Sequence, residues 1–153
     1  MSNPSAEYAV TIARPVDAVF AYVADGENCP AWRPGVLDIK RISGDGLGAR
    51  YAQGVRGPMG RRIAADYEIT AFEPNRRIEF QTTTRPARPH GRYLFEADNG
   101  GTRLSFALHA TLTGISGLLM GGAVQRTMND EVRTLDNLKR VLETPAGDAP
   151  QER

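Results

Sequence analysis

The chain has 153 residues, which is the usual length of one domain. Its formal net charge is +1, with 19 basic and 18 acidic residues, and this balance argues against a nucleic-acid-binding protein, which carries a clear basic excess. No run reaches the roughly 18 apolar residues of a membrane span, and the N-terminus lacks the basic and apolar regions of a secretory signal. The lone cysteine, Cys29, cannot form an internal disulfide, so we expect a cytoplasmic protein.

The first part of the chain predicts one strand and two short helices. Residues 8–12 alternate between larger and smaller side chains, which is typical of a strand. Pro15 favours a helix start because its fixed φ and missing N–H suit the first helical position. Apolar residues follow at helical spacing until Asp25-Gly26, and a second short helical segment is expected at residues 27–32.

The middle of the chain predicts an antiparallel meander. Residues 62–72 alternate clearly, with Ile63, Tyr67 and Ile69 on one face. Turns rich in Gly, Pro and Asn separate the strands, and Asn99-Gly100 is the signal of a tight hairpin. Short turns between successive strands favour antiparallel neighbours. The strands are expected at residues 36–42, 49–55, 62–72, 78–84, 92–97 and 102–112.

A single long helix is expected at residues 116–143, ended by Pro145. Its apolar residues gather in one stripe at 100° per residue. An antiparallel sheet buries one face and needs a cover, and only this helix is long enough to provide it. The sheet should therefore wrap around the helix, with residues 1–6 as an N-terminal tail, 7–143 as the domain and 144–153 as a disordered tail.

Four segments of the chain carry a resemblance to a known family. They are PAWRPGV at 30–36, YEITAFEPNRRIEF at 67–80, GGTRLSF at 100–106 and NLKRVLE at 137–143. With the element order, they resemble the SRPBCC superfamily, the START-like proteins of helix-grip fold, and within it the polyketide cyclase/dehydrase group. The resemblance implies an α+β fold: a curved antiparallel sheet of about seven strands around a long C-terminal helix, two short helices after the first strand, and an internal apolar cavity.

The inward faces of the predicted elements supply the candidate cavity lining. In an ordinary domain these side chains would form a packed core, whereas the resemblance implies that they line the cavity. Tyr67 and Tyr93 carry hydroxyls, which usually find a partner when buried, and they are the candidate polar anchors for a ligand. The candidate lining residues are Phe20, Trp32, Tyr51, Tyr67, Ile69, Tyr93, Phe95, Leu104, Phe106, Leu108, Val124, Met128, Glu131 and Leu135.

Glu131 is a polar residue inside the apolar stripe of the helix, about 40° from Leu135. A carboxylate on a buried face must find a partner or take up a proton. The favoured interpretation is that Glu131 lies at the edge of the stripe and pairs with an arginine. The alternative is that it faces the cavity as an acid/base group or a ligand-binding group.

Three loops are expected at one end of the sheet, because alternate hairpins of a meander lie at the same end. They span residues 56–61, 85–90 and 113–118, and we expect them to surround the cavity mouth. Basic residues and apolar tips there suit an amphiphile with an anionic head, or an anionic lipid surface, unless they only reflect an arginine-rich chain. The candidate mouth residues are Arg56, Met59, Arg61, Arg85, Arg88, His90, Ile115 and Leu118.

No standard catalytic set is present, so catalytic residues cannot be assigned. His90, His109 and Cys29 are too few and too scattered for zinc, and we expect neither a metal nor a cofactor.

The leading hypothesis is binding of a small apolar or aromatic ligand, lipid-like or polyketide-like and including acidic ones, in the cavity between sheet and helix. The alternative is a polyketide cyclase/aromatase in which Tyr, Arg and Glu groups assist proton transfer; a protein-interaction module is a third class, disfavoured by the near-neutral charge. The chain is expected to be a monomer or homodimer.

Overall fold

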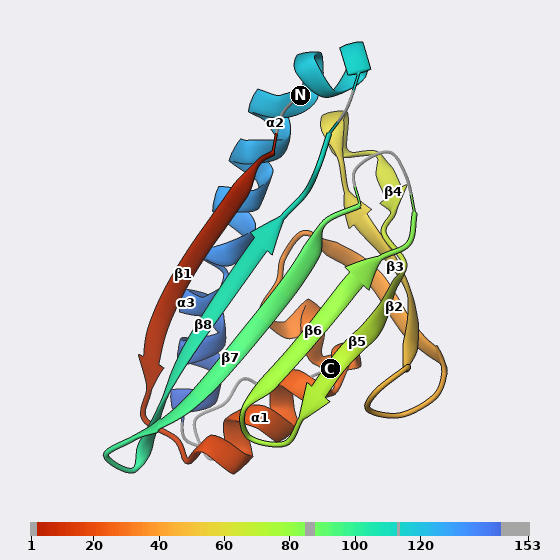
Figure 1. Cartoon of the computed structure of the whole chain (residues 1–153). Coiled ribbons are helices and arrows are strands. Elements are labelled where there is room, and N and C mark those ends of the chain that lie inside the picture. The colour runs from red at the N-terminus through yellow and green to blue at the C-terminus, as the bar shows by residue number, and fades with distance from the viewer. Residues whose placement is uncertain (1–2, 85–87, 113, 145–153) are drawn as a thin grey trace.

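The structure is a computed structural model that describes residues 3–84, 88–112 and 114–144, without the side chains of residue 58 and residues 114–120 (Figure 1). β1 (Ser5–Ile12) leads into α1 (Val16–Ala24) and the 3₁₀ helix η1 (Gly26–Ala31). The strands that follow are β2 (Val36–Ser43), β3 (Arg50–Arg56), β4 (Arg62–Ala64), β5 (Tyr67–Glu73), β6 (Arg77–Thr82), β7 (His90–Asp98) and β8 (Gly101–His109), with a 3₁₀ turn, η2 (Pro58–Gly60), between β3 and β4. The helices α2 (Gly114–Val132) and α3 (Leu135–Glu143) come after β8.

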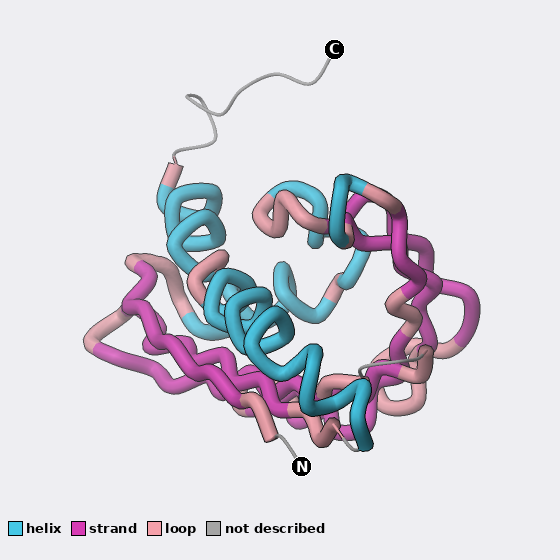
Figure 2. The backbone as a smooth tube through the Cα atoms, turned by 90° about the horizontal axis from the view of Figure 1, so that it is seen from above, coloured by secondary structure: helices cyan, strands magenta, loops and turns pink. Residues whose placement is uncertain are grey.

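The strands form one antiparallel sheet in the order β1-β8-β7-β6-β5-β3-β2, with β4 paired to β3 off this path. The sheet is strongly curved, and the helices lie in its hollow side (Figures 1 and 2). α2 and α3 contact β1, α1 contacts β7 and β8, and η1 contacts β2. The predicted α+β fold, a curved antiparallel sheet around C-terminal helices, is confirmed.

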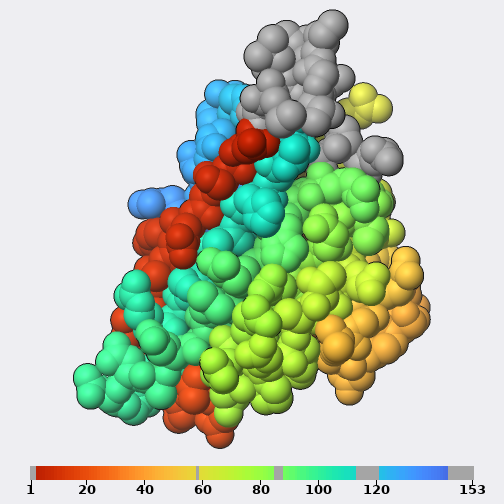
Figure 3. Space-filling view, in the orientation of Figure 1, coloured from red at the N-terminus to blue at the C-terminus, as the bar shows by residue number. Residues whose placement is uncertain are grey.

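The core lies between the concave face of the sheet and the helices. Strand alternation turns every second side chain inward, so that Tyr93 opposes Phe106 and Phe95 opposes Leu104 across β7 and β8. Leu104 and Phe106 are fully buried, and Leu135 of α3 is buried against the same core. The outer face of the sheet, seen in Figure 3, is formed by β5 to β8 with β1 along one edge.

The strand expected at residues 62–72 is two strands. β3 pairs with β4 through Gly54–Arg56 and with β5 through Arg50 and Tyr51. Between the two strands, the Asp66 carboxylate accepts a hydrogen bond from the Gln53 backbone N–H at 3.0 Å, where a strand carbonyl would otherwise stand. The predicted alternation is therefore broken at residues 65–66, and Ile63 is partly exposed while Tyr67 is buried.

The expected single helix is also divided. At residues 133–134 the hydrogen bonding tightens to i→i−3, with the Thr134 N–H donating to the Glu131 carbonyl at 3.1 Å. The Thr134 hydroxyl donates to the same carbonyl, a local bond that competes with regular helix. The apolar stripe continues across the break, since Met128, Val132 and Leu138 are all buried.

The N-terminal end of the folded region differs from the expected bound. β1 begins at Ser5, inside the segment 1–6 expected to be a tail, because Ser5 and Ala6 pair with His109 and Leu108 of β8. The expected disordered tail lies, apart from Thr144, outside the described residues. Among the helices that the structure describes, none is both long enough and apolar enough to cross a membrane.

Candidate functional site

A hollow lies on the concave side of the sheet, between β3, β5, β6 and β7 and the α1–η1 segment. It has room for about two water molecules (≈30 Å³), and its unfilled space reaches ≈520 Å³ when the open side is counted. Its wall is apolar over Ile69, Phe72, Ile78 and Phe80. The polar groups of the wall belong to Cys29, Arg33, Tyr51, Gln53, Tyr67 and Tyr93.

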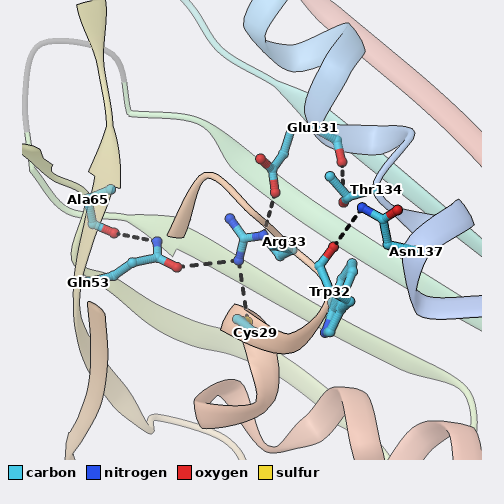
Figure 4. A network of polar contacts seen from close by, with 8 residues as sticks. All are labelled: Cys29, Trp32, Arg33, Gln53, Ala65, Glu131, Thr134 and Asn137. Atoms are coloured by element: carbon cyan, nitrogen blue, oxygen red, sulfur yellow. Dashed lines mark hydrogen bonds and ion pairs between the residues drawn. The ribbon is translucent and has the colours of Figure 1, made fainter. Parts of the chain in front are cut away.

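Arg33 is the charged residue of this wall, and it is held on several sides (Figure 4). It follows η1 and is only 8% exposed. Its Nε donates to the Glu131 carboxylate of α2, and its Nη1 donates to Gln53 Oε1 at 3.3 Å and to Cys29 Sγ at 3.4 Å. Gln53 in turn donates from Nε2 to the Ala65 carbonyl at 3.1 Å, which fixes the orientation of its amide.

The charge of Arg33 is stabilised by its ion pair. Burial is the largest single influence and lowers the pKa of the guanidinium, but the Glu131 carboxylate, with smaller contributions from Cys29, Tyr93 and Tyr67, outweighs it, so the pKa lies well above its ordinary value. The second terminal nitrogen, Nη2, has no hydrogen-bond partner among the described residues. Arg33 is therefore a permanently charged donor whose unused N–H groups remain available within the interior.

Three tyrosines complete the polar part of the hollow. Tyr51 and Tyr67 stack with ring centroids 5.0 Å apart, and the Tyr51 hydroxyl accepts a hydrogen bond from the Gly26 N–H at 3.2 Å. Tyr93 stacks on Phe106 at 4.4 Å. Within the described part of the chain, the hydroxyls of Tyr67 and Tyr93 form no hydrogen bond to protein groups; the two residues are only 7% and 5% exposed, but their oxygen atoms keep some accessible surface in the hollow.

Burial raises the pKa of both Tyr67 and Tyr93, an effect that the positive charge of Arg33 only partly offsets. Both hydroxyls therefore stay protonated at neutral pH and can act as hydrogen-bond donors. The hollow thus offers several donors and one compensated cation within an apolar wall.

The predicted lining residues divide into three groups. Tyr51, Tyr67, Ile69 and Tyr93 line the hollow. Val124 is partly buried against the core, and Glu131 reaches the hollow through its ion pair with Arg33. The others are buried in the packed core and do not line this hollow: Phe20, Trp32, Phe95, Leu104, Phe106, Leu108, Met128 and Leu135.

The arginine partner of Glu131 is a residue that the sequence pattern did not single out. Of the two interpretations of Glu131, the structure has the ion pair, and its partner is the buried Arg33 rather than a surface arginine. Arg33 is one of 17 arginines, and only its place between Trp32 and Pro34 in a mostly apolar segment distinguishes it in the sequence. Gln53, whose amide oxygen accepts from Arg33, is likewise not among the predicted lining residues, because strand alternation left its inward direction uncertain.

The predicted mouth is only partly described. The β3–β4 hairpin carries Arg56, Met59 and Arg61, all exposed, and Met59 is 96% exposed. This hairpin, the β6–β7 connection with the exposed Arg88, and the start of α2 lie toward one end of the sheet (Figure 1). Arg85 and the side chains of Ile115 and Leu118 lie outside the described residues.

His90 does not point toward the interior with Tyr93, as a place at the mouth would require. It stands three residues before Tyr93 on β7, and strand alternation therefore turns it to the opposite, outer face. There its Nε2 lies 3.0 Å from Glu79 Oε1, and its ring centroid lies 5.1 Å from that of His109. No group of three metal-ligating side chains occurs in the part of the chain that the structure describes.

The fold and the interior define the class of protein: a START-like, helix-grip domain. A family model described as "Polyketide cyclase / dehydrase and lipid transport" matches residues 3–143, and the chain belongs to this family. A search of curated proteins found no match.

Solved structures share this fold at low sequence identity. TTHA0849 from Thermus thermophilus superposes with a TM-score of 0.77 at 23% identity, over 90% of this chain and 95% of that one. A START superfamily protein from Mycobacterium smegmatis gives 0.71 at 14% identity, over 91% and 97%. The di-domain ARO/CYC StfQ from the steffimycin biosynthetic pathway gives 0.80 at 16% identity, over 95% of this chain and 53% of that one. Family membership indicates a ligand-binding or polyketide cyclase type of role.

Proposed function

We propose that this protein binds a small apolar or aromatic molecule, lipid-like or polyketide-like, in the interior between the curved sheet and the C-terminal helices. The observation that supports it is a pair of tyrosine hydroxyls that border the hollow without a protein partner, beside an arginine with unused donors. Buried polar groups in proteins are nearly always hydrogen-bonded, and Tyr hydroxyls usually find a partner. Hydrogen-bond donors that have no protein partner in an apolar hollow are expected where a bound ligand supplies the acceptor.

The size of the hollow limits how such a ligand can lie. About 30 Å³ accommodates one polar group and no ring, so the apolar body must use the open side of the hollow. The larger space of ≈520 Å³ includes open solvent, so it describes the room at the open side and not an enclosed cavity. An acidic head, where the ligand has one, would be best accommodated outside the hollow, near the exposed Arg56, Arg61 and Arg88.

A polyketide cyclase is the second candidate function. The polar groups of the hollow favour ligand binding over this catalytic function. General acid–base catalysis works best when the pKa of the group lies near the working pH. Burial raises the pKa of Tyr67 and Tyr93 away from neutrality, and Glu131 is engaged by Arg33. These groups are better suited to holding a ligand by hydrogen bonds than to moving its protons, so binding is placed first.

Binding can be tested on the full-length chain in two steps. Native mass spectrometry of freshly purified protein should reveal a co-purified small molecule. Equilibrium dialysis with 2-acetonaphthone, an aromatic ketone, should then show saturable binding that Tyr93→Phe weakens about fivefold, since one hydrogen bond contributes about 1 kcal/mol. The matched control is Tyr8→Phe, because the Tyr8 hydroxyl bonds to Asp136 at the surface, at 2.8 Å. Absence of both a co-purified molecule and dialysis binding would contradict the proposal.

A further inference from the structure

The positive charge in the hollow is already neutralised by the protein. Arg33 is the charged side chain among the described lining residues, and the Glu131 carboxylate binds its Nε. The side chains of the pair are 10% and 23% exposed, so solvent screens their interaction only in part. An incoming ligand therefore meets a dipole with unused donors rather than an isolated cation.

This arrangement discriminates between two kinds of oxygen acceptor. A carboxylate entering the hollow would bring a second negative charge to one buried cation, and its loss of hydration would be left uncompensated. A carbonyl oxygen brings no net charge and has two lone pairs, which Arg33 Nη2 and a tyrosine hydroxyl can both engage. Both groups can accept hydrogen bonds from these donors, and a carboxylate accepts them more strongly; the charge balance and the loss of hydration are what oppose the carboxylate.

The wall also supplies donors more readily than acceptors. The Gln53 amide oxygen is used by Arg33 and its amide nitrogen by the Ala65 carbonyl, and the Tyr51 hydroxyl oxygen accepts from Gly26. The groups without partners among the described residues are Arg33 Nη2 and the hydroxyls of Tyr67 and Tyr93, and all three can donate. A ligand group that only accepts hydrogen bonds fits this set best.

We propose that the hollow selects ligands that place a neutral oxygen acceptor, a ketone or ester carbonyl, beside Arg33, Tyr67 and Tyr93, and that it rejects a carboxylate there. The Arg33–Glu131 pair is the selecting element. The inference rests on the proposed function and deepens it by naming the chemical class of the buried group. It also restricts the expectation of an acidic ligand, whose charged group would have to remain outside the hollow.

The test compares matched naphthalene probes by equilibrium dialysis of the full chain at about pH 7.5, where a carboxylic acid is ionised. The wild-type protein should bind 2-acetonaphthone and the uncharged ester methyl 2-naphthoate at least about tenfold more tightly than 2-naphthoate. Glu131→Gln leaves the charge of Arg33 uncompensated, so the preference for ketone over carboxylate should fall about tenfold or more. Glu143→Gln is the control, because Glu143 pairs with Lys139 in α3, away from the hollow.

Each outcome separates the selectivity from the binding itself. Wild-type protein that binds 2-naphthoate as tightly as the ketone and the ester would overturn the inference while leaving the binding function intact. An unchanged preference in folded Glu131→Gln would overturn the role of the ion pair. If Glu131→Gln does not fold by circular dichroism, the ester–acid comparison in wild-type protein still decides the selectivity. Failure of every probe to bind, with no co-purified molecule, would overturn both the function and the inference.

Discussion

Gly26 is the residue against which two tyrosines of the hollow pack. A Cβ at this position would lie 2.5 Å from the Tyr67 hydroxyl and 2.7 Å from the Tyr51 ring. Gly26→Ala should therefore force the stacked rings apart and destabilise the fold by about 1–3 kcal/mol, the usual cost of overpacking. Urea unfolding measures this, and Gly35→Ala is the matched control because nothing lies within 4 Å of its Cβ. Equal stability losses in the two variants would show that packing at Gly26 is not the cause.

Some residues of the candidate site could be predicted from the sequence, and others could not. Tyr67 and Tyr93 could be predicted because strand alternation fixes which side chains turn inward. The position of Glu131 within an apolar stripe predicted an arginine partner, but not which arginine. Arg33 could not be found in this way, because it follows a 3₁₀ helix rather than a periodic element and lies 98 residues from Glu131. Pairings across such separations depend on the tertiary fold.

The β7–β8 hairpin shows how local signals fix an element. Asn99 and Gly100 have φ of 52° and 84°, which is the pair of positive values that a tight hairpin turn requires. Gly100→Ala should destabilise the protein by about 1 kcal/mol through backbone strain alone, since no atom lies within 4 Å of the added Cβ. The measurement is chemical unfolding beside Gly35→Ala, whose backbone has no positive φ. Unchanged stability of Gly100→Ala would contradict this account.

The strand expected at residues 62–72 and the helix expected at residues 116–143 are each divided in two. Side-chain hydrogen bonds accompany both breaks, and such bonds cannot be predicted from the spacing of apolar residues. The Asp66 carboxylate accepts a hydrogen bond from a backbone N–H of β3, and the Thr134 hydroxyl donates one to a backbone carbonyl of α2. Asp and Thr compete with regular structure in this way, but the competition succeeds only where a partner is in place. The apolar stripe continues through the break in the helix, whereas the alternation of buried side chains stops at the break in the strand, where Ile63 is exposed. The number and order of the other elements could be predicted because their patterns are uninterrupted.

At the scale of the whole molecule, the curvature of the sheet and the position of the helices create the interior. β1 and β2 are the two edges of the sheet, and α2–α3 pack against the β1 edge while η1 packs against β2. Figure 2 shows the helices within the curve of the sheet. The Arg33–Glu131 pair joins the segment after η1 to the end of α2, and it therefore links two covering elements that come from opposite halves of the chain. The ligand selectivity proposed above and the contact between these two covering elements thus involve the same ion pair.

The outer face of the sheet should make the stability of the molecule depend on pH through His90. Burial lowers the pKa of His90, and His109 and Arg92 lower it further, while Glu79 opposes them. Between the unfolded value of about 6.5 and the lower native value, the unfolded chain binds more protons, so acidification through this range reduces stability. His90→Gln removes this contribution, and its unfolding free energy should fall less than that of the wild type when the pH is lowered from about 7.5 to 5.5. The lowered pKa values of Asp38 and Glu143 contribute stability that is lost only as the pH falls through their acidic range, below this window and alike in both proteins, so the difference between the two curves isolates His90. Parallel curves over this range would show that His90 titrates alike in the folded and unfolded chains.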